Sequence, residues 1–131
     1  MSKTKVVCPT APTRPVRLNM GMSMPAWFDL PPMGPEMLTS IDWEGVASST
    51  RQVHAILERE IAAGVPSDKI IVGGFSQGGC LALRAALSFP KVRGASRAPG
   101  RLLASLSHED GHLRRMCVKL CVFECYSHWG V

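Results

Sequence analysis

The spacing of apolar residues along the chain predicts alternating strands and helices. Residues 3–8 form a short β-branched run, K-T-K-V-V-C, which ends at Pro9 and predicts a strand. Residues 69–72, K-I-I-V, are too short for a helix. Because they follow a predicted helix, they indicate a buried parallel strand. The order strand, loop, helix, strand, helix is typical of an α/β fold, in which a parallel sheet has flanking helices.

Residues 42–63 have the period of an amphipathic helix. Every three or four positions the chain returns to one stripe: Val46, Thr50, Val53, Leu57 and Ile61. Asp42 is expected to cap the N-terminus of this helix, and Gly64 with Pro66 to end it. Residues 77–87 return to helical composition, with four side chains expected to face the sheet: Cys80, Leu83, Ala86 and Leu87.

Residues 9–36 are expected to form a long loop. Seven of the ten prolines lie there, and proline at this density prevents a regular helix or a central strand. The same segment carries methionines and aromatic residues, including Met24 and Trp27. Such side chains need a packing surface, so plain disorder is not expected.

Composition separates the chain at about Pro90. Residues 1–90 hold eight Lys or Arg and seven Asp or Glu, whereas residues 91–131 hold seven and three, with three of the five cysteines. We expect a domain over residues 1–90 and a divergent, basic, poorly ordered tail over residues 91–131. The odd cysteine count fits reduced thiols in a cytoplasmic protein. The N-terminal residues are not expected to form a signal peptide, and the sequence contains no run of roughly 18 apolar residues.

Residues 74–78, G-F-S-Q-G, match the G-x-S-x-G pattern of a serine nucleophile. They lie where the predicted buried strand meets the predicted helix, and a sharp turn there exposes the Ser76 hydroxyl above the sheet. The backbone N–H of Gln77, at the start of the helix, is expected to stabilise an oxyanion. The alternative is a glycine-rich turn that binds a phosphate or only packs, although the P-loop pattern does not occur there.

Two segments resemble the acyl-protein thioesterase family, which are lysophospholipase-like carboxylesterases of the α/β-hydrolase fold. They are residues 8–29, CPTAPTRPVRLNMGMSMPAWFD, and residues 70–79, IIVGGFSQGG, and the likeness covers roughly residues 3–90. The resemblance implies a serine hydrolase that removes fatty acyl groups, notably palmitate from protein thioesters, or that cleaves lysophospholipids or small esters. It implies no metal and no organic cofactor.

The resemblance also assigns roles to individual residues. Ser76 would be the nucleophile and the Gln77 amide one oxyanion donor. The loop that bears Met24 and Trp27 would lie near the acyl-binding groove, so these two residues are candidate substrate contacts, with core packing as the alternative. The implied partners are an acylated protein or a lipid ester, with at most peripheral membrane contact and no nucleic acid.

Compared with this family, we expect a partial α/β-hydrolase that is truncated at both ends. The His-Gly-x-Gly loop that supplies a second oxyanion N–H in the family is absent, as are the downstream segments that carry the triad Asp and His. His54 is expected to be a half-exposed helix residue. The tail offers only Asp110, His108, His112 and His128. We therefore expect impaired catalysis. The alternative is a catalytically inactive isoform that acts as a binding or regulatory fragment.

We assign no function to the other patterns in the tail. Residues 108–112 match H-E-x-x-H, but Asp110 and Gly111 are poor helix formers, so a chance match is favoured over zinc. Cys117, Cys121 and Cys125 contain no C-x-x-C pair and are interpreted as incidental thiols. Residues 117–123 form an apolar run that is able to pair with an exposed sheet edge.

Overall fold

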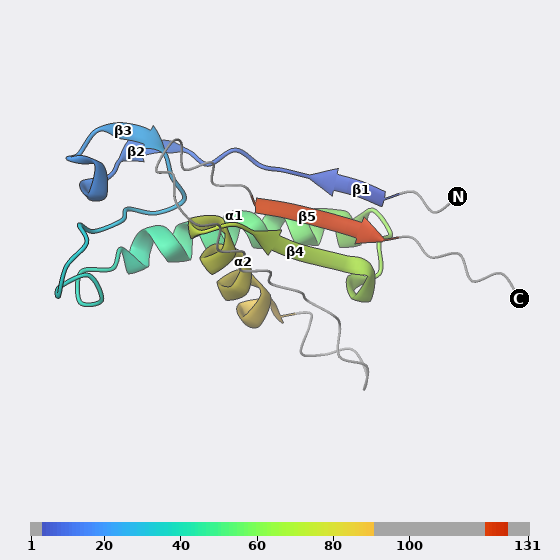
Figure 1. The fold of residues 1–131 in the computed structure, drawn as a ribbon. Coiled ribbons are helices and arrows are strands. Elements are labelled where there is room, and N and C mark those ends of the chain that lie inside the picture. Colours follow the sequence, from blue (N-terminus) through green and yellow to red (C-terminus); the bar gives the residue numbers. More distant parts are fainter. Residues whose placement is uncertain (1–3, 91–119, 126–131) are drawn as a thin grey trace, which may run out of the picture.

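The computed structural model describes residues 4–90 and 120–125, and its main sheet contains three strands in the order β1-β5-β4 (Figure 1). They are β1 (Thr4–Val7), β5 (Leu120–Cys125) and β4 (Ile70–Gly74). β5 is antiparallel to both of its neighbours, and Val122 lies opposite Val7 on one side and Val72 on the other. β1 and β4 therefore run in the same direction but are separated by β5.

The expected parallel pairing is wrong for the strands that the structure describes. The apolar run of β4 correctly indicated a buried strand, since Ile70 and Val72 are 4% and 0% exposed. That pattern does not specify which strand will pair with it or in which direction. The neighbour comes from the apolar run of the tail, which was expected to pair with an exposed sheet edge and pairs with both β1 and β4. The division of the chain at residue 90 stays a prediction.

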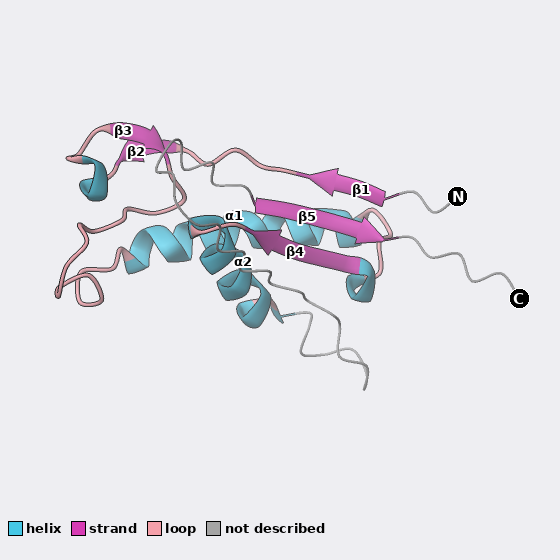
Figure 2. Cartoon of the chain, viewed as in Figure 1, coloured by secondary structure: helices cyan, strands magenta, loops and turns pink. Residues whose placement is uncertain are grey.

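A short hairpin interrupts the segment that was expected to be a loop. β2 (Thr13–Pro15) and β3 (Ser23–Pro25) pair antiparallel as a separate two-stranded sheet, with a 3-10 helix, η1 (Arg17–Asn19), between them. The chain reverses at Met20 and Gly21, whose φ angles of 53° and 76° are both positive. Prolines are tolerated here because two isolated strands of three residues have only edges. The rest of the connection to the first long helix is loop (Figure 2).

Helix α1 (Trp43–Ala62) confirms the predicted amphipathic helix and its ends. The Asp42 side chain accepts a hydrogen bond from the Gly45 N–H at 2.8 Å, which is the expected N-cap. Gly64 follows the last turn with a φ of 98°, the left-handed conformation that glycine adopts without strain. Four members of the predicted stripe are buried and the fifth packs partly against the core: Val46, Thr50, Val53, Leu57 and Ile61.

Beyond capping α1, Asp42 contacts two other parts of the chain, the loop at Asp29 and the hairpin at Arg14. Its Oδ2 accepts from the Asp29 N–H at 2.9 Å and lies 3.5 Å from the Arg14 guanidinium on the hairpin. Burial alone would raise the pKa of Asp42, but the amides of Asp29 and Gly45 and the charges of Arg14 and Arg17 outweigh it. The pKa therefore lies below its ordinary value, and the carboxylate stabilises the folded state.

We expect Asp42→Ala to lower the free energy of unfolding by about 1–2 kcal/mol at neutral pH, because the cap is lost. Asp42→Asn keeps a capping oxygen and should lose less. Since the folded pKa is lowered, the contribution of Asp42 is present above the unfolded pKa and is lost as the pH falls through the folded pKa. Urea unfolding over a pH series should therefore show a shallower acid loss for Asp42→Ala than for the wild type. Equal acid slopes would contradict this prediction.

Helix α2 (Gln77–Ser88) follows β4 and packs against β4, β5 and α1. A 3-10 helix, η2 (Ser67–Lys69), leads into β4. The face of α2 that is buried matches the expected one only at Ala86, which is 6% exposed. Leu83 and Leu87 are 40% and 69% exposed and Cys80 is exposed, whereas the buried apolar positions are Leu81, Ala82, Ala85 and Ala86. Small alanines allow the helix to approach the sheet closely, and this leaves the Cys80 side of the helix open.

Candidate active site

Ser76 occupies a strained turn between β4 and α2. Its φ is 50° and its ψ is −119°, a combination outside the regions that L-residues ordinarily adopt. Such a conformation costs on the order of 1–3 kcal/mol and persists only where the surrounding structure holds it. The Gly78 N–H donates to the Phe75 carbonyl at 2.9 Å and the Cys80 N–H to the Ser76 carbonyl at 3.1 Å, which fixes the turn from the helix side. Ser76 itself is exposed, as expected for a nucleophile at the end of a strand.

The tightness of this turn explains its glycines. A Cβ atom on Gly74 would lie 2.4 Å from both the carbonyl carbon and the carbonyl oxygen of Gly78. Real side chains do not approach a backbone so closely. The strand end and the first turn of α2 are in contact here, and only glycine at position 74 permits that contact.

Gln77 has a free backbone amide and a fully engaged side chain. As the first residue of α2, it directs its N–H away from the helix, and this N–H makes no hydrogen bond to another residue in the described part of the chain. That is the state required of an oxyanion donor. The side chain is 3% exposed, with Oε1 accepting from the Trp27 N–H at 2.9 Å and Nε2 donating to the Phe28 carbonyl at 2.7 Å.

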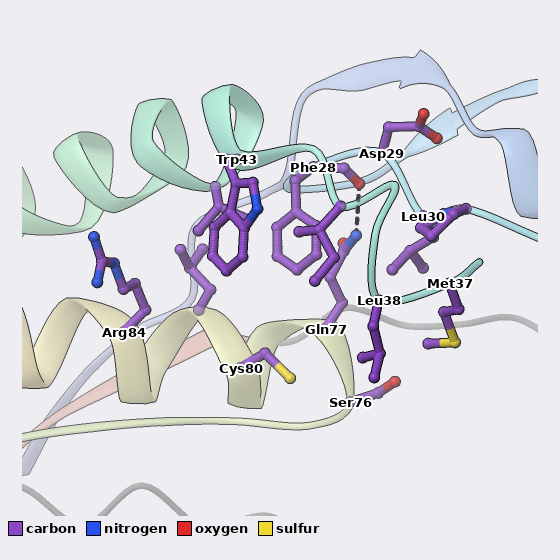
Figure 3. A pocket seen from close by; sticks show the side chains of 14 residues that line it. Phe28, Asp29, Leu30, Met37, Leu38, Trp43, Ser76, Gln77, Cys80 and Arg84 are labelled. Carbon is purple, nitrogen blue, oxygen red and sulfur yellow. Dashed lines mark hydrogen bonds between the residues drawn. The ribbon is translucent and has the colours of Figure 1, made fainter. Parts of the chain in front are cut away.

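An apolar cavity of about 540 Å³ opens beside Ser76 (Figure 3). One face of α2 forms one side, the start of α1 a second, and the loop over residues 28–41 the third. The Ser76 hydroxyl lies at one end beside Leu38, and Cys80 and Arg84 follow along the helix. The remaining apolar lining comes chiefly from Phe28, Leu30, Pro31, Met37, Ile41, Trp43, Val46 and Leu81. The size is ordinary for a small-molecule site.

The two predicted substrate contacts do not line this cavity. Trp27 is 1% exposed and belongs to the hydrophobic core, and its carbonyl accepts a hydrogen bond from the buried Ser49 hydroxyl. Met24 is half-buried in β3, where its Sδ lies 3.7 Å from the Asn19 side-chain nitrogen. These positions favour the packing alternative for Trp27 and give no support to a substrate contact at Met24.

Several lining residues were not identified from the sequence. Cys80 and Arg84 stand four and eight positions after Ser76, so they lie on the same side of α2 as the serine. This spacing was a usable signal once Ser76 was the candidate nucleophile. Leu38, which is 78% exposed, comes from a loop without periodicity, and no sequence pattern indicated it. Trp43, which is 65% exposed, is the first residue of α1 and stands three positions before Val46 of the predicted stripe, so helical spacing was a usable signal for it.

His54 does not serve Ser76 as a base. It is half-buried, as expected, and its Nε2 lies 2.9 Å from the Ala85 carbonyl oxygen and 3.4 Å from the Ser88 hydroxyl. Its ring packs against Phe89, with 5.1 Å between ring centroids. His54 is the single histidine in residues 4–90 and 120–125, and Ser76 Oγ makes no hydrogen bond within those ranges.

The remaining candidates of the tail lie outside the described residues. This applies to Asp110, to the three tail histidines, to the H-E-x-x-H match over residues 108–112, and to Cys117. Among the described residues, no cluster of three His, Cys, Asp or Glu side chains is arranged to hold a metal ion. No helix in that part of the chain has the length and apolar character needed to cross a membrane.

The strained serine turn, the adjoining helix and the apolar cavity define a hydrolase-like site on a partial α/β-hydrolase fold. The sequence matches the model of the phospholipase/carboxylesterase family over residues 1–129. The chain therefore belongs to the phospholipase/carboxylesterase family, which confirms the resemblance identified from its motifs.

Individual relatives agree with this assignment. The chain is 42% identical over 87 residues to acyl-protein thioesterase 1 of Schizosaccharomyces pombe, a match that covers 66% of this chain and 38% of that protein. It is 42% identical over 91 residues to the probable carboxylesterase Os04g0669500 of Oryza sativa, covering 70% of this chain and 34% of that protein. The crystal structure of Arabidopsis thaliana SOBER1 superposes with a TM-score of 0.58 at 39% identity, covering 63% of this chain and 39% of SOBER1. The chain thus spans less than two fifths of these relatives.

Proposed function

We propose that this chain carries the nucleophile of a serine hydrolase of the acyl-protein thioesterase type, which cleaves acyl thioesters, such as palmitoyl-protein, or carboxylic esters. The observation that carries the proposal is the exposed Ser76 in its strained turn at the mouth of an apolar cavity. A surface serine without a catalytic role gains nothing from a strained backbone conformation, which lowers the free energy of unfolding. An acylated protein or a lipid ester in the cytoplasm is the proposed substrate.

The described residues account for part of the reaction. Ser76 Oγ would attack the acyl carbonyl while the Gln77 N–H stabilises the developing oxyanion. The cavity would hold the acyl chain, because its walls are almost entirely aliphatic, aromatic and methionine side chains. The thiol or alcohol then leaves with a proton, and water hydrolyses the acyl-serine. Because His54, the single histidine among the described residues, contacts the Ala85 carbonyl, a histidine base would come from outside those residues. A second oxyanion donor would also be needed.

A second candidate function is that of a catalytically inactive fragment that binds acyl chains or partners. The observation that favours it is the engagement of His54 with the Ala85 carbonyl rather than with Ser76. A serine without a base is a weak nucleophile. The cavity beside Ser76 would still bind an acyl chain in such a protein.

A fluorophosphonate probe distinguishes the two functions. We expect the wild type to be labelled and Ser76→Ala to lose labelling, because the substitution removes Oγ while keeping the Cβ and the turn. Ser88→Ala, which removes a half-buried hydroxyl from the last turn of the same helix, should be labelled like the wild type. A folded wild-type protein that the probe does not label would support the inactive fragment.

A further inference from the structure

We propose that the Gln77 side chain is a positioning residue that holds the wall of the acyl cavity at a defined place relative to Ser76. The inference rests on the proposed function, because it assigns the cavity to the acyl chain. The side chain is buried, and both ends of its amide are used: Oε1 accepts from the Trp27 N–H and Nε2 donates to the Phe28 carbonyl. Figure 3 shows the second of these bonds, which joins Gln77 at the start of α2 to the backbone of the loop at Phe28.

The amide orientation is settled by its partners. A backbone N–H only donates and a backbone carbonyl only accepts, so the oxygen of Gln77 must face Trp27 and its nitrogen must face Phe28. No other uncharged side chain of this length offers an acceptor and two donors at its end. At neutral pH, where a glutamate would be ionised, the two contacts therefore require glutamine and not only a polar residue.

The position of Gln77 in the chain connects these two bonds to the catalytic groups. Its own backbone N–H is the proposed oxyanion donor, and Ser76 precedes it directly. The backbone that it binds continues into Phe28, Asp29 and Leu30, which line the cavity. Because Gln77 is bonded both to this part of the loop and, covalently, to Ser76, a movement of the loop would also move the backbone next to the nucleophile.

Other bonds hold the same loop, but they come from η1 and α1 rather than from α2. On η1, the Arg17 N–H donates to the Asp29 carboxylate at 2.8 Å and the Leu18 N–H donates to the Leu30 carbonyl at 2.8 Å. The Ser49 hydroxyl donates to the Trp27 carbonyl, and Asp42 accepts from the Asp29 N–H at 2.9 Å. Ser49 lies on α1 and Asp42 is its N-cap. Within the described part of the chain, the two bonds of Gln77 are the side-chain hydrogen bonds that join the start of α2 to the loop. Ser49 therefore offers a matched control that anchors the loop at the same residue, Trp27, from α1 and not from the start of α2.

The test uses two substitutions and a ligand without ionisable groups. Gln77→Leu keeps the approximate size and removes both bonds. Gln77→Glu places a carboxylate oxygen against the Phe28 carbonyl at neutral pH. In acid, the protonated carboxyl can accept from the Trp27 N–H and donate to the Phe28 carbonyl, as the amide does. Burial raises the pKa of the introduced carboxyl, so this recovery should occur in mild acid.

Binding of a fluorescent long-chain alcohol to each variant provides a readout that does not need catalysis. We expect Gln77→Leu to bind about tenfold more weakly than the wild type at every pH. Gln77→Glu should bind weakly at neutral pH and approach the wild type in acid. The wild type and Ser49→Ala should show no such recovery in acid. Circular dichroism at each pH confirms that the compared proteins are folded.

Two results would overturn the proposal: wild-type affinity in Gln77→Leu, or an affinity of Gln77→Glu that does not recover in acid. A pH response in Ser49→Ala like that of Gln77→Glu would also count against it, because the response would then not come from the carboxyl introduced at position 77. Failure of the hydrolase proposal appears separately as a wild type without fluorophosphonate labelling. If the wild type is labelled, Gln77→Leu should raise KM more for a palmitoyl ester than for an acetyl ester.

Discussion

Gly74→Ala is expected to lower the free energy of unfolding by about 3 kcal/mol or more and to abolish fluorophosphonate labelling. The added methyl group would lie 2.4 Å from the backbone of Gly78, and neither β4 nor the first turn of α2 is able to move without losing its contacts. Overpacking against side chains typically costs about 1–3 kcal/mol, and a backbone obstacle costs more because it cannot change rotamer. Displacement of α2 would also move the Ser76 hydroxyl and the Gln77 N–H out of line with the acyl carbonyl on which both are proposed to act.

Gly34→Ala provides the control for this prediction. Gly34 lies in the loop, has no neighbour within 4 Å of an added Cβ, and does not have a positive φ. Its substitution should leave stability unchanged or raise it slightly, because alanine restricts the unfolded chain. Urea unfolding and probe labelling of the two variants side by side check the result. A stable, labelled Gly74→Ala protein would show that the turn is looser than the structure indicates.

The parts of the fold that the sequence predicted are those in which local physics decides the structure. α1 was predicted together with both ends, because the stripe from Val46 to Ile61, the cap at Asp42 and the positive φ at Gly64 all act within a few residues. The turn at Ser76 was predicted for the same reason. Glycine is needed at position 74 because the backbone of Gly78 lies against it within one tight turn, and the requirement is visible as a short pattern.

The parts that were missed depend on contacts between distant segments. The direction of the strand beside β4 depends on β5, which is about fifty residues further along the chain. The buried face of α2 was misjudged because leucines or alanines occupy both of its sides. The cavity wall over residues 28–41 has no periodicity, and its position depends on the bonds of Gln77 and Asp42 to Trp27, Phe28 and Asp29. No sequence pattern indicates that a polar side chain will be buried and will bind two distant backbone groups.

Trp27→Ala is expected to lower the free energy of unfolding by about 3–5 kcal/mol, the usual cost of removing a buried aromatic side chain. Trp27 is the largest of the fully buried side chains in the described part of the chain and packs in the core between the helices and the loop. A loss of this size is a large fraction of the roughly 5–15 kcal/mol that stabilises a typical domain. Urea unfolding, followed by far-ultraviolet circular dichroism, measures it.

Trp27→Phe separates packing from substrate contact. The indole Nε1 of Trp27 is buried and has no hydrogen-bond partner among the described residues, so phenylalanine removes no hydrogen bond. Phenylalanine also leaves less empty space in the core than alanine does. Packing alone therefore predicts a stability loss well below that of alanine and an unchanged affinity for the long-chain alcohol. If Trp27 instead contacts the acyl chain, Trp27→Phe should weaken alcohol binding while stability stays near that of the wild type. The core position of the indole leads us to expect the first result, because a side chain that is 1% exposed in the unliganded protein has no surface to offer a ligand.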